Sequence, residues 1–187
     1  MTAIGQKISD FESDAYHEEE IKKIKLSDYR GKWLVLLFYP ADFTFICPTE
    51  LGEAADLYPE FQKNEAEILS VSTDTVFTHK AWHDASAVIK KIKYPMMADP
   101  TGNLCRAFGT YLENEGLSLR GTFIIDPDGV LKASDIHDNS IGRSGAEILR
   151  KLQAAKFVRE NKGLVCPASW HPGEKTLKPG LDLVGKI

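Results

Sequence analysis

One cysteine stands where the sequence could turn a thiol into a nucleophile. Cys47 follows the apolar run Trp33–Tyr39 and a short loop, and it directly precedes Pro48. Proline suits the first turn of a helix, because its missing N–H would have no partner there. The free amides and the dipole at such a helix start favour an anion. The sequence therefore predicts a Cys47 thiolate, exposed at the positive end of a helix.

The thiolate is the reactive form of cysteine, and an ordinary thiol with a pKa near ~8.5 is only slightly ionised at neutral pH. Thr44, three residues before Cys47, can place a hydroxyl beside the sulfur, and an arginine from elsewhere would complete the site. The alternative is a buried structural cysteine, which is what most free cysteines are. The succession of strand, loop, Cys-Pro and helix favours the reactive interpretation.

The other two cysteines have different surroundings. Cys166 lies on a C-terminal segment rich in glycine and proline, which suits a thiol that must move to meet a second sulfur, although an idle surface thiol is the alternative. Two sulfurs can bond only when their Cα atoms are within about 7 Å, so a disulfide with Cys47 would require local unfolding around Cys47. Cys105 lies in the helix-like stretch Asn103–Phe108, where core packing is the simpler account.

No metal or cofactor site is predicted. His79 and His83 have the i, i+4 spacing of a zinc-binding helix, but Lys80 stands where the glutamate of that motif belongs and no third ligand is evident. Solvated or packed histidines are therefore expected.

The composition indicates a globular protein. The chain has 187 residues, of which 43% are hydrophobic, and this is enough for a core. A net charge of −4 does not indicate the positively charged surface that binds nucleic acid. The longest apolar run, Trp33–Tyr39, is too short to span a bilayer, and Met1–Phe11 contain no secretory signal. We therefore expect a cytoplasmic protein that binds neither nucleic acid nor membrane.

Strands and helices alternate along the sequence. A helix is predicted after Cys47, where Pro59 should kink or shorten it, and a turn at Asp126–Gly129 signals a hairpin. The order predicts an α/β fold with a central mixed β-sheet flanked by helices. The pattern breaks after Asn161, which predicts a domain of residues 1–160 and a C-terminal arm of residues 161–187. The predicted strands are Trp33–Tyr39, Ile68–Ser72, Met96–Ala98, Thr122–Ile125 and Val130–Ala133, and the other predicted helices are Phe77–Lys93, Asn103–Phe108 and Gly145–Phe157.

Cys47 and Cys166 lie in motifs that resemble those of one family. Pro40-Ala-Asp-Phe-Thr-Phe-Ile-Cys47-Pro resembles the active-site loop of the peroxiredoxins, Pro-x-x-x-Thr-x-x-Cys. Val165-Cys166-Pro-Ala-x-Trp170 resembles the resolving-cysteine segment of their typical two-cysteine subgroup. The resemblance covers essentially the whole chain and is closest to the bacterial alkyl hydroperoxide reductases. Further matching segments are Ser72-Thr-Asp-Thr, Phe77-Thr-His-Lys-Ala-Trp82, Ala98-Asp-Pro, Phe123-Ile-Ile-Asp126 and Leu181-Asp-Leu-Val-Gly-Lys-Ile187.

This resemblance implies a thioredoxin-like fold and a thiol-dependent peroxidase, active on hydrogen peroxide and organic hydroperoxides in antioxidant defence and redox homeostasis. Cys47 would become a sulfenic acid, which Cys166 of the partner subunit would resolve as a disulfide. The resemblance also implies a homodimer that assembles into a decamer, and reduction by a flavoprotein disulfide reductase of the AhpF type or by thioredoxin. The remaining implied roles are shielding by Pro40, binding of sulfur and peroxide by Thr44 and Arg120, and orientation of this cluster by Glu50 and Arg143.

Two other classes of function compete with peroxide reduction. A thiol–disulfide exchange protein on the same fold would need Cys-x-x-Cys at the strand–helix junction, where this chain has Thr44 and Cys47. A structural or chaperone-like assembly is compatible with the decameric rings that the family implies, and it could coexist with catalysis.

Overall fold

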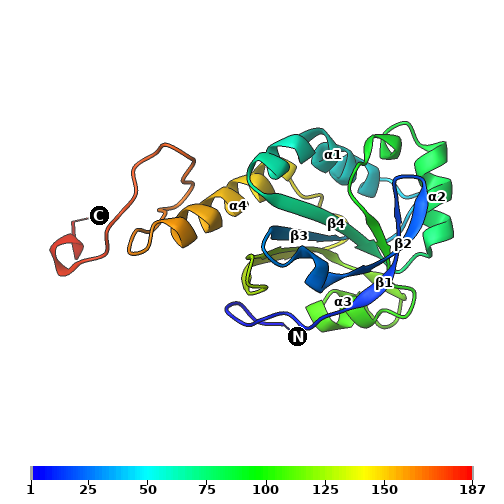
Figure 1. Ribbon diagram of the computed structural model, residues 1–187, viewed down its shortest axis with the longest axis horizontal. Helices are drawn as coiled ribbons and strands as arrows, with labels where there is room; N and C mark the ends of the chain where they lie inside the picture. Colours follow the sequence, from blue (N-terminus) through cyan, green and yellow to red (C-terminus); the bar gives the residue numbers. More distant parts are fainter. Residues whose placement is uncertain (1, 187) are drawn as a thin grey trace. The chain divides into compact units, whose positions relative to one another are not determined.

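The computed structural model describes residues 2–186, which form two compact units. The first unit runs up to Gly145 and the second begins at Ala146 (Figure 1). The boundary predicted after residue 160 stays a prediction.

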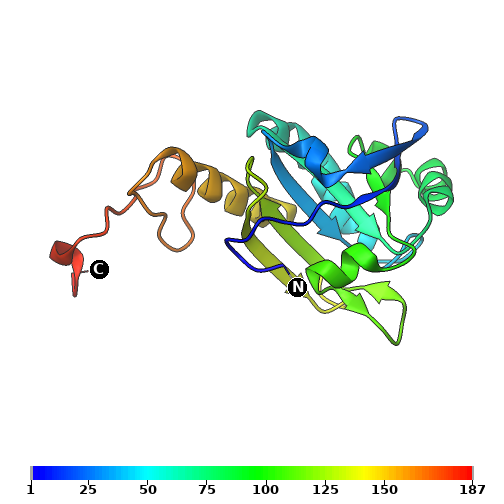
Figure 2. The same ribbon diagram turned by 60° about the horizontal axis from the view of Figure 1, so that its bottom comes forward.

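The first unit is built on a mixed seven-stranded sheet with the order β2-β1-β5-β4-β3-β8-β9. Strands β3, β4 and β5 are parallel, whereas β1 runs antiparallel to β5 and β8 runs antiparallel to β3. The two edges are β2 and β9 (Figure 2). The strands are β1 (Glu12–His17), β2 (Glu20–Lys25), β3 (Trp33–Phe38), β4 (Ala66–Ser72), β5 (Met96–Ala98), β8 (Arg120–Ile125) and β9 (Leu131–His137), with a separate hairpin of β6 (Tyr111–Leu112) and β7 (Leu117–Ser118).

Both faces of the central strands are buried. All six residues of β3 are inaccessible to solvent, because successive side chains point to opposite faces and each face is covered. Helices α1 (Cys47–Lys63) and α2 (Val76–Ala85) lie on one face, and α3 (Asn103–Phe108) lies on the other (Figure 1). The parallel centre explains why β3 is a continuous apolar run and why six of the seven residues of β4 are buried.

The core on the α3 side joins sheet and helix residues. Leu34, Leu36 and Phe38 of β3 belong to one apolar cluster with Cys105 and Phe108 of α3. The Phe38 and Phe108 rings lie 5.4 Å apart. Met97 of β5 belongs to the same cluster and is 0% exposed, whereas Met96 lies outside it and is 1% exposed.

The second unit is helix α4 (Gly145–Glu160) with the chain folded back along it. The Trp170 ring packs 4.9 Å from that of Phe157, and Arg150 donates to the Trp170 carbonyl oxygen at 3.1 Å. Val165 and Leu177 form an isolated antiparallel bridge. The short 3-10 helices of the chain are η1 (Leu26–Tyr29), η2 (Ile89–Lys91) and η3 (Leu181–Leu183).

Most predicted elements are confirmed, with differences in extent. The predicted helix Phe77–Lys93 was too long, because α2 ends at Ala85 and Ser86 has an extended backbone. Pro59 lies inside α1, yet the helix continues to Lys63. The turn after β8 is confirmed: Gly129 has φ of 79°, and the Asp126 side chain accepts from two backbone amides. Strands β1, β2, β6 and β7 were not predicted.

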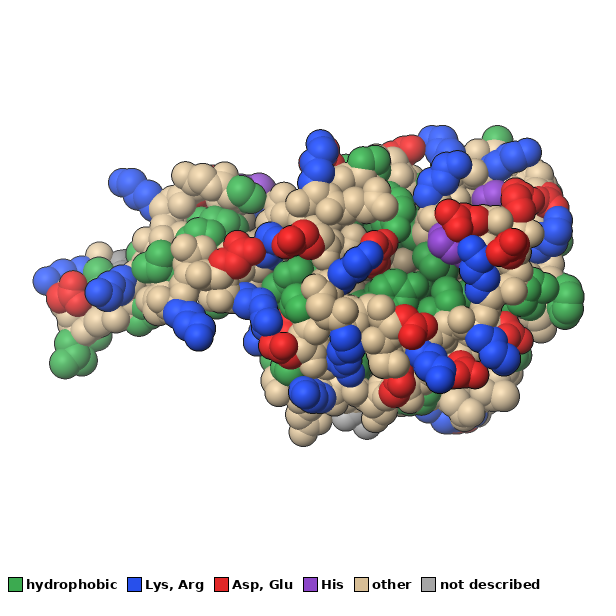
Figure 3. All heavy atoms as spheres, in the orientation of Figure 1, with side chains coloured by type: hydrophobic (Ala, Val, Ile, Leu, Met, Phe, Trp, Pro, Cys, Tyr) green, Lys and Arg blue, Asp and Glu red, His purple; other side chains and the backbone are tan. Residues whose placement is uncertain are grey.

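The surface agrees with the small net charge. Acidic and basic side chains are interspersed over the face drawn in Figure 3, as expected for a net charge of −4. Within residues 2–186, no helix combines the length and apolarity needed to cross a bilayer.

Candidate active site

Cys47 is the first residue of α1 and lies where the loop from β3 ends. Pro48 occupies the first turn, as expected, and no side chain caps the helix start. The positive end of the α1 dipole therefore lies beside the sulfur. The prediction of an exposed sulfur was wrong: Cys47 is 0% exposed, because the loop before it closes over the helix start.

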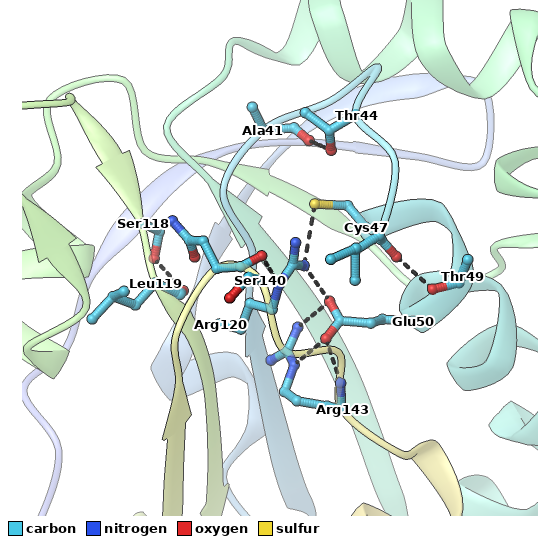
Figure 4. A network of polar contacts seen from close by, with 12 residues as sticks. Ala41, Thr44, Cys47, Thr49, Glu50, Ser118, Leu119, Arg120, Ser140 and Arg143 are labelled. Atoms are coloured by element: carbon cyan, nitrogen blue, oxygen red, sulfur yellow. Dashed lines mark hydrogen bonds and ion pairs between the residues drawn. The ribbon is translucent and has the colours of Figure 1, made fainter.

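Arg120 supplies the cation that the sequence required from elsewhere. Strand β8 pairs antiparallel with β3, and Leu37 faces Thr122, so the start of β8 lies beside the loop that leads to Cys47. Arg120 is 3% exposed, and its Nη1 donates to the Cys47 Sγ at 3.4 Å (Figure 4). Its Nε donates to the Asn139 carbonyl oxygen at 3.0 Å. A fixed guanidinium at this distance supplies a donor and a positive charge directly beside the sulfur.

Glu50 holds Arg120 in place. Its Oε2 accepts from Arg120 Nη1 at 2.7 Å and from Arg143 Nη2 at 3.1 Å. Its Oε1 accepts from the Arg143 backbone N–H at 2.7 Å and from Arg143 Nε at 3.0 Å. Burial raises the pKa of Glu50, but the hydrogen bonds and charge of Arg143 and the charge of Arg120 hold it below its usual value. One carboxylate between two guanidiniums leaves a net positive charge next to the sulfur.

Arg143 anchors the cluster to the sheet. Its Nη1 donates to the Gly121 carbonyl oxygen at 2.7 Å and to Thr122 Oγ1 at 3.2 Å, both on β8. All three charged residues of the cluster are buried, and such charges are stable only when paired and hydrogen-bonded as these are.

Thr44 lies in the turn above the sulfur (Figure 4). Its hydroxyl donates to the Ala41 carbonyl oxygen at 2.8 Å. The Thr44 hydroxyl proton is therefore engaged in a hydrogen bond within the turn, and the lone pairs of Oγ1 are left to accept from a substrate hydroxyl. Pro40 is buried at the start of the same loop. The structure thus brings together five of the seven predicted residues, Thr44, Cys47, Glu50, Arg120 and Arg143, and buries Pro40 at the start of the loop that carries two of them.

Cys166, the seventh, belongs to the second unit. It is partly exposed, and its Sγ lies 3.9 Å from the Ala154 carbonyl oxygen. Burial raises the pKa of Cys166, which the charge of Arg150 opposes. All three cysteines are free thiols.

Cys105 packs in the core, as predicted. It is 0% exposed, and burial together with the nearby Asp99 carboxylate raises the pKa of Cys105 to about 12. Such a thiol is neutral and unreactive at physiological pH.

Sequence reasoning missed the partners of the active-site loop. Asp42 is buried, and one of its oxygens lies 2.7 Å from His79 Nδ1. The only signal for Asp42 was its place inside the Pro40–Cys47 motif. His79 was expected to be solvated or packed, and it is packed. Among residues 2–186, no cluster of three or more histidine, cysteine or acidic side chains could hold a metal ion.

Comparison with known proteins agrees with this geometry. Residues 4–134 match the model of the AhpC/TSA family. The chain is 51% identical to alkyl hydroperoxide reductase C of Salmonella typhimurium over 187 residues, and 50% identical to that of Staphylococcus aureus over 189 residues; both alignments span both full-length chains.

Solved structures show the same fold. The crystal structure of Enterococcus faecalis AhpC has a TM-score of 0.86 at 48% identity, and the match covers 89% of this chain and 100% of that one. Reduced 2-Cys peroxiredoxin from Plasmodium vivax has a TM-score of 0.92 at 30% identity, and that match covers 97% and 96%. These neighbours confirm the thioredoxin-like fold that the sequence predicted. The chain therefore belongs to the AhpC/TSA family, and it is a thiol-dependent peroxide reductase of the two-cysteine peroxiredoxin class.

Proposed function

We propose that Cys47 is the residue that attacks the hydroperoxide and that Cys166 of the partner subunit resolves the product. The observation that supports this most strongly is the contact of Arg120 Nη1 with the Cys47 Sγ at the first residue of α1. A cation and a helix start both act on one sulfur, and both favour its thiolate.

The reaction has three steps. The Cys47 thiolate forms an S–O bond with one peroxide oxygen while the O–O bond breaks, and the displaced oxygen leaves as an alcohol or water after taking up a proton. The sulfur is thereby oxidised by two electrons to a sulfenic acid. The thiol of Cys166 then displaces water and forms a disulfide, which an external dithiol reduces back to two thiols.

Arg120 and Thr44 are proposed to bind the peroxide. No described residue accepts a hydrogen bond from Arg120 Nη2, so its hydrogens are available to the oxygen on which charge develops. The lone pairs of Thr44 can accept the peroxide hydroxyl, since its own proton goes to Ala41. Pro40 would shield the site from water, and Glu50 with Arg143 would keep Arg120 aligned.

The proposed disulfide requires Cys47 to leave its pocket. Its sulfur is inaccessible, and a disulfide needs Cα atoms within about 7 Å. We therefore propose that the first turn of α1 unwinds after oxidation and presents the sulfenic acid to Cys166.

Three serine variants test the scheme. Cys47→Ser should abolish peroxide consumption, because the attacking sulfur is gone. Cys166→Ser should still reduce one equivalent of peroxide but form no disulfide-linked dimer on a non-reducing gel. Cys105→Ser is the matched control, and it should keep both activity and disulfide. Consumption of peroxide by Cys47→Ser at the wild-type rate would overturn the assignment.

We further propose a homodimer that assembles into a decamer. Two-cysteine peroxiredoxins are typically oligomeric. Phe43, Phe45 and Phe77 expose 55%, 92% and 71% of their surface, which favours burial of these rings between copies. Sedimentation velocity of Phe77→Asp should show smaller assemblies than wild type, whereas Ile21→Asp on the edge strand β2 should not. Unchanged assembly in Phe77→Asp would argue against this surface.

The reductant is proposed to be a flavoprotein disulfide reductase of the AhpF type or thioredoxin. Free thiols and a cycle that consumes reducing equivalents both suit the cytoplasm. Supplying the oxidised enzyme with each reductant in turn, and measuring return of the two thiols, would identify the partner.

A further inference from the structure

A second polar cluster holds the loop between β3 and Cys47. Asp42, in the middle of this loop, is buried. Its Oδ1 accepts from the Tyr39 hydroxyl at 2.7 Å, and its Oδ2 lies 2.7 Å from His79 Nδ1 on α2. Its backbone N–H donates to Asp74 Oδ2 at 2.8 Å. One loop residue is therefore fixed through both its side chain and its backbone.

The cluster consists of donors that converge on the Asp42 carboxylate. Burial, followed by the charge of Asp42, raises the pKa of Tyr39 well above its usual value, so its hydroxyl keeps the proton that it donates. His79 is 0% exposed, and its Nε2 has no partner among the described residues. The other ring nitrogen, Nδ1, is therefore the atom through which α2 is tied to the loop.

The backbone next to Asp42 is strained. Phe43 has φ of 55°, in the left-handed region that a phenylalanine rarely adopts. Such a conformation is unfavourable and persists only where the surroundings impose it. Here Asp42 is fixed on one side of Phe43, and on the other side Thr44 closes the turn by its bond to Ala41.

We propose that Asp42 is a positioning residue that, through His79, sets the place of Thr44 above the Cys47 sulfur. The proposal rests on the role for Thr44 proposed above. The hydrogen bonds of Asp42 go to Tyr39, His79 and Asp74 and not to the sulfur or Arg120, so its loss should misplace the peroxide without removing the thiolate's partner. A misplacement of about 1 Å can cost a hundredfold in rate.

Two reactions of the same sulfur separate positioning from activation. Asp42→Ala should lower the second-order rate constant for hydrogen peroxide tenfold or more, measured by stopped flow. Its rate of alkylation by iodoacetamide at neutral pH should stay within threefold of wild type, because alkylation needs the thiolate but not Thr44. Asp84→Ala, which removes an exposed α2 carboxylate paired with Lys80, is the control and should change neither rate.

Two variants of His79 test the link itself. An asparagine amide nitrogen occupies the position of the histidine Nδ1, whereas a glutamine amide nitrogen occupies that of Nε2. His79→Asn should therefore retain most of the peroxide rate constant, and His79→Gln should lose it tenfold or more. In the double variant with Asp42→Ala, His79→Gln should add little, because both changes break one link.

The outcomes distinguish this proposal from the proposed function. A normal peroxide rate in His79→Gln, or an equal rate in the asparagine and glutamine variants, would overturn the link. A parallel fall of peroxide reduction and alkylation would show a general collapse of the site and would also overturn it. Activity in Cys47→Ser would instead refute the assignment of the sulfur. If Asp42→Ala fails to fold, the comparison of His79→Asn with His79→Gln is sufficient to test the proposal.

Discussion

Glu50 is the residue on which the order of the active site depends. It accepts four hydrogen bonds from two arginines, and all three side chains are buried. Removing one partner from a buried ion cluster is costly, of order 3–5 kcal/mol, because the remaining charge is left unpaired. The carboxylate therefore balances two like charges and keeps Arg120 within reach of the sulfur.

Arg120→Lys should lower the rate constant for peroxide reduction about a hundredfold, the usual cost of losing an aligned donor to the developing charge. A lysine keeps the charge, but one ammonium cannot reproduce the bonds to Cys47, Glu50 and the Asn139 carbonyl oxygen. Stopped-flow kinetics with hydrogen peroxide measures this effect. Arg106→Lys, at an exposed arginine paired with Glu113, is the matched control. A rate within threefold of wild type would exclude Arg120 from the chemistry.

Glu50→Gln should destabilise the protein in a pH-dependent way. Because the pKa of Glu50 is lowered in the folded state, its carboxylate contributes stability that is fully present above its unfolded value near 4.5 and is lost as the pH falls through the folded value. The difference in unfolding free energy between wild type and Glu50→Gln should therefore be largest at neutral pH and shrink below about pH 4.5. Urea unfolding at several pH values measures it, and a pH-independent difference would contradict the argument.

The residues of this site were not equally predictable from the sequence. Cys47 and Thr44 could be found from local sequence, because a Cys-Pro after a strand has a direct physical meaning. Arg143 and Glu50 are 93 residues apart, and no local pattern links them, so only the family resemblance indicated both. The burial of Cys47 was missed for the same reason, since it depends on how the loop folds back.

In the proposed cycle, helix α1 unwinds at its start while its remainder stays folded. The Tyr94 hydroxyl donates to the Leu51 carbonyl oxygen at 2.9 Å, inside the buried face of the helix. This bond lies directly after the first turn. It therefore resists unwinding that spreads from Cys47.

Tyr94→Phe should speed disulfide formation up to about fivefold, because a hydrogen bond of about 1 kcal/mol no longer opposes opening. Quenched-flow trapping of the disulfide measures the rate, and faster hydrogen exchange at the first turn should accompany it. Tyr58→Phe is the matched control. The Tyr58 ring packs 5.5 Å from that of Tyr94, but the Tyr58 hydroxyl lies nearer the far end of α1 and donates to Glu67 on β4. Equal acceleration in both variants would remove the special role of Tyr94.

The β1–β2 and β6–β7 hairpins were not predicted from the sequence. In β2, four of six residues are exposed, so apolar alternation is weak there. The turn between β1 and β2 uses Glu18 and Glu19 at φ of 52° and 64°, whereas hairpin signals rely on Asn or Gly at such angles. The central strands β3 and β4 were predicted correctly because both of their faces are buried, which makes β3 wholly apolar and leaves an apolar pair, Ile68 and Leu69, in β4.

On the scale of the whole molecule, the three cysteines should differ in their reactivity toward an alkylating reagent. In native protein, iodoacetamide should label Cys166, and also Cys47 whenever the start of α1 opens, but leave Cys105 unmodified, because burial raises the pKa of Cys105 to about 12. All three should react after denaturation. Mass spectrometry of tryptic peptides reads the result. Labelling of Cys105 at the rate of Cys166 in folded protein would show that the core opens far more readily than its packing indicates.

The burial of Met96 and Met97 shields their thioether sulfurs from oxidation by the hydroperoxide substrate. Thioether sulfur is readily converted by peroxide to a sulfoxide, a polar group that would disrupt the sheet from its centre. Both side chains lie in β5 and are 1% and 0% exposed. Among residues 2–186, we therefore expect oxidation to fall on Cys47 and Cys166, whose proposed disulfide an external dithiol can reduce.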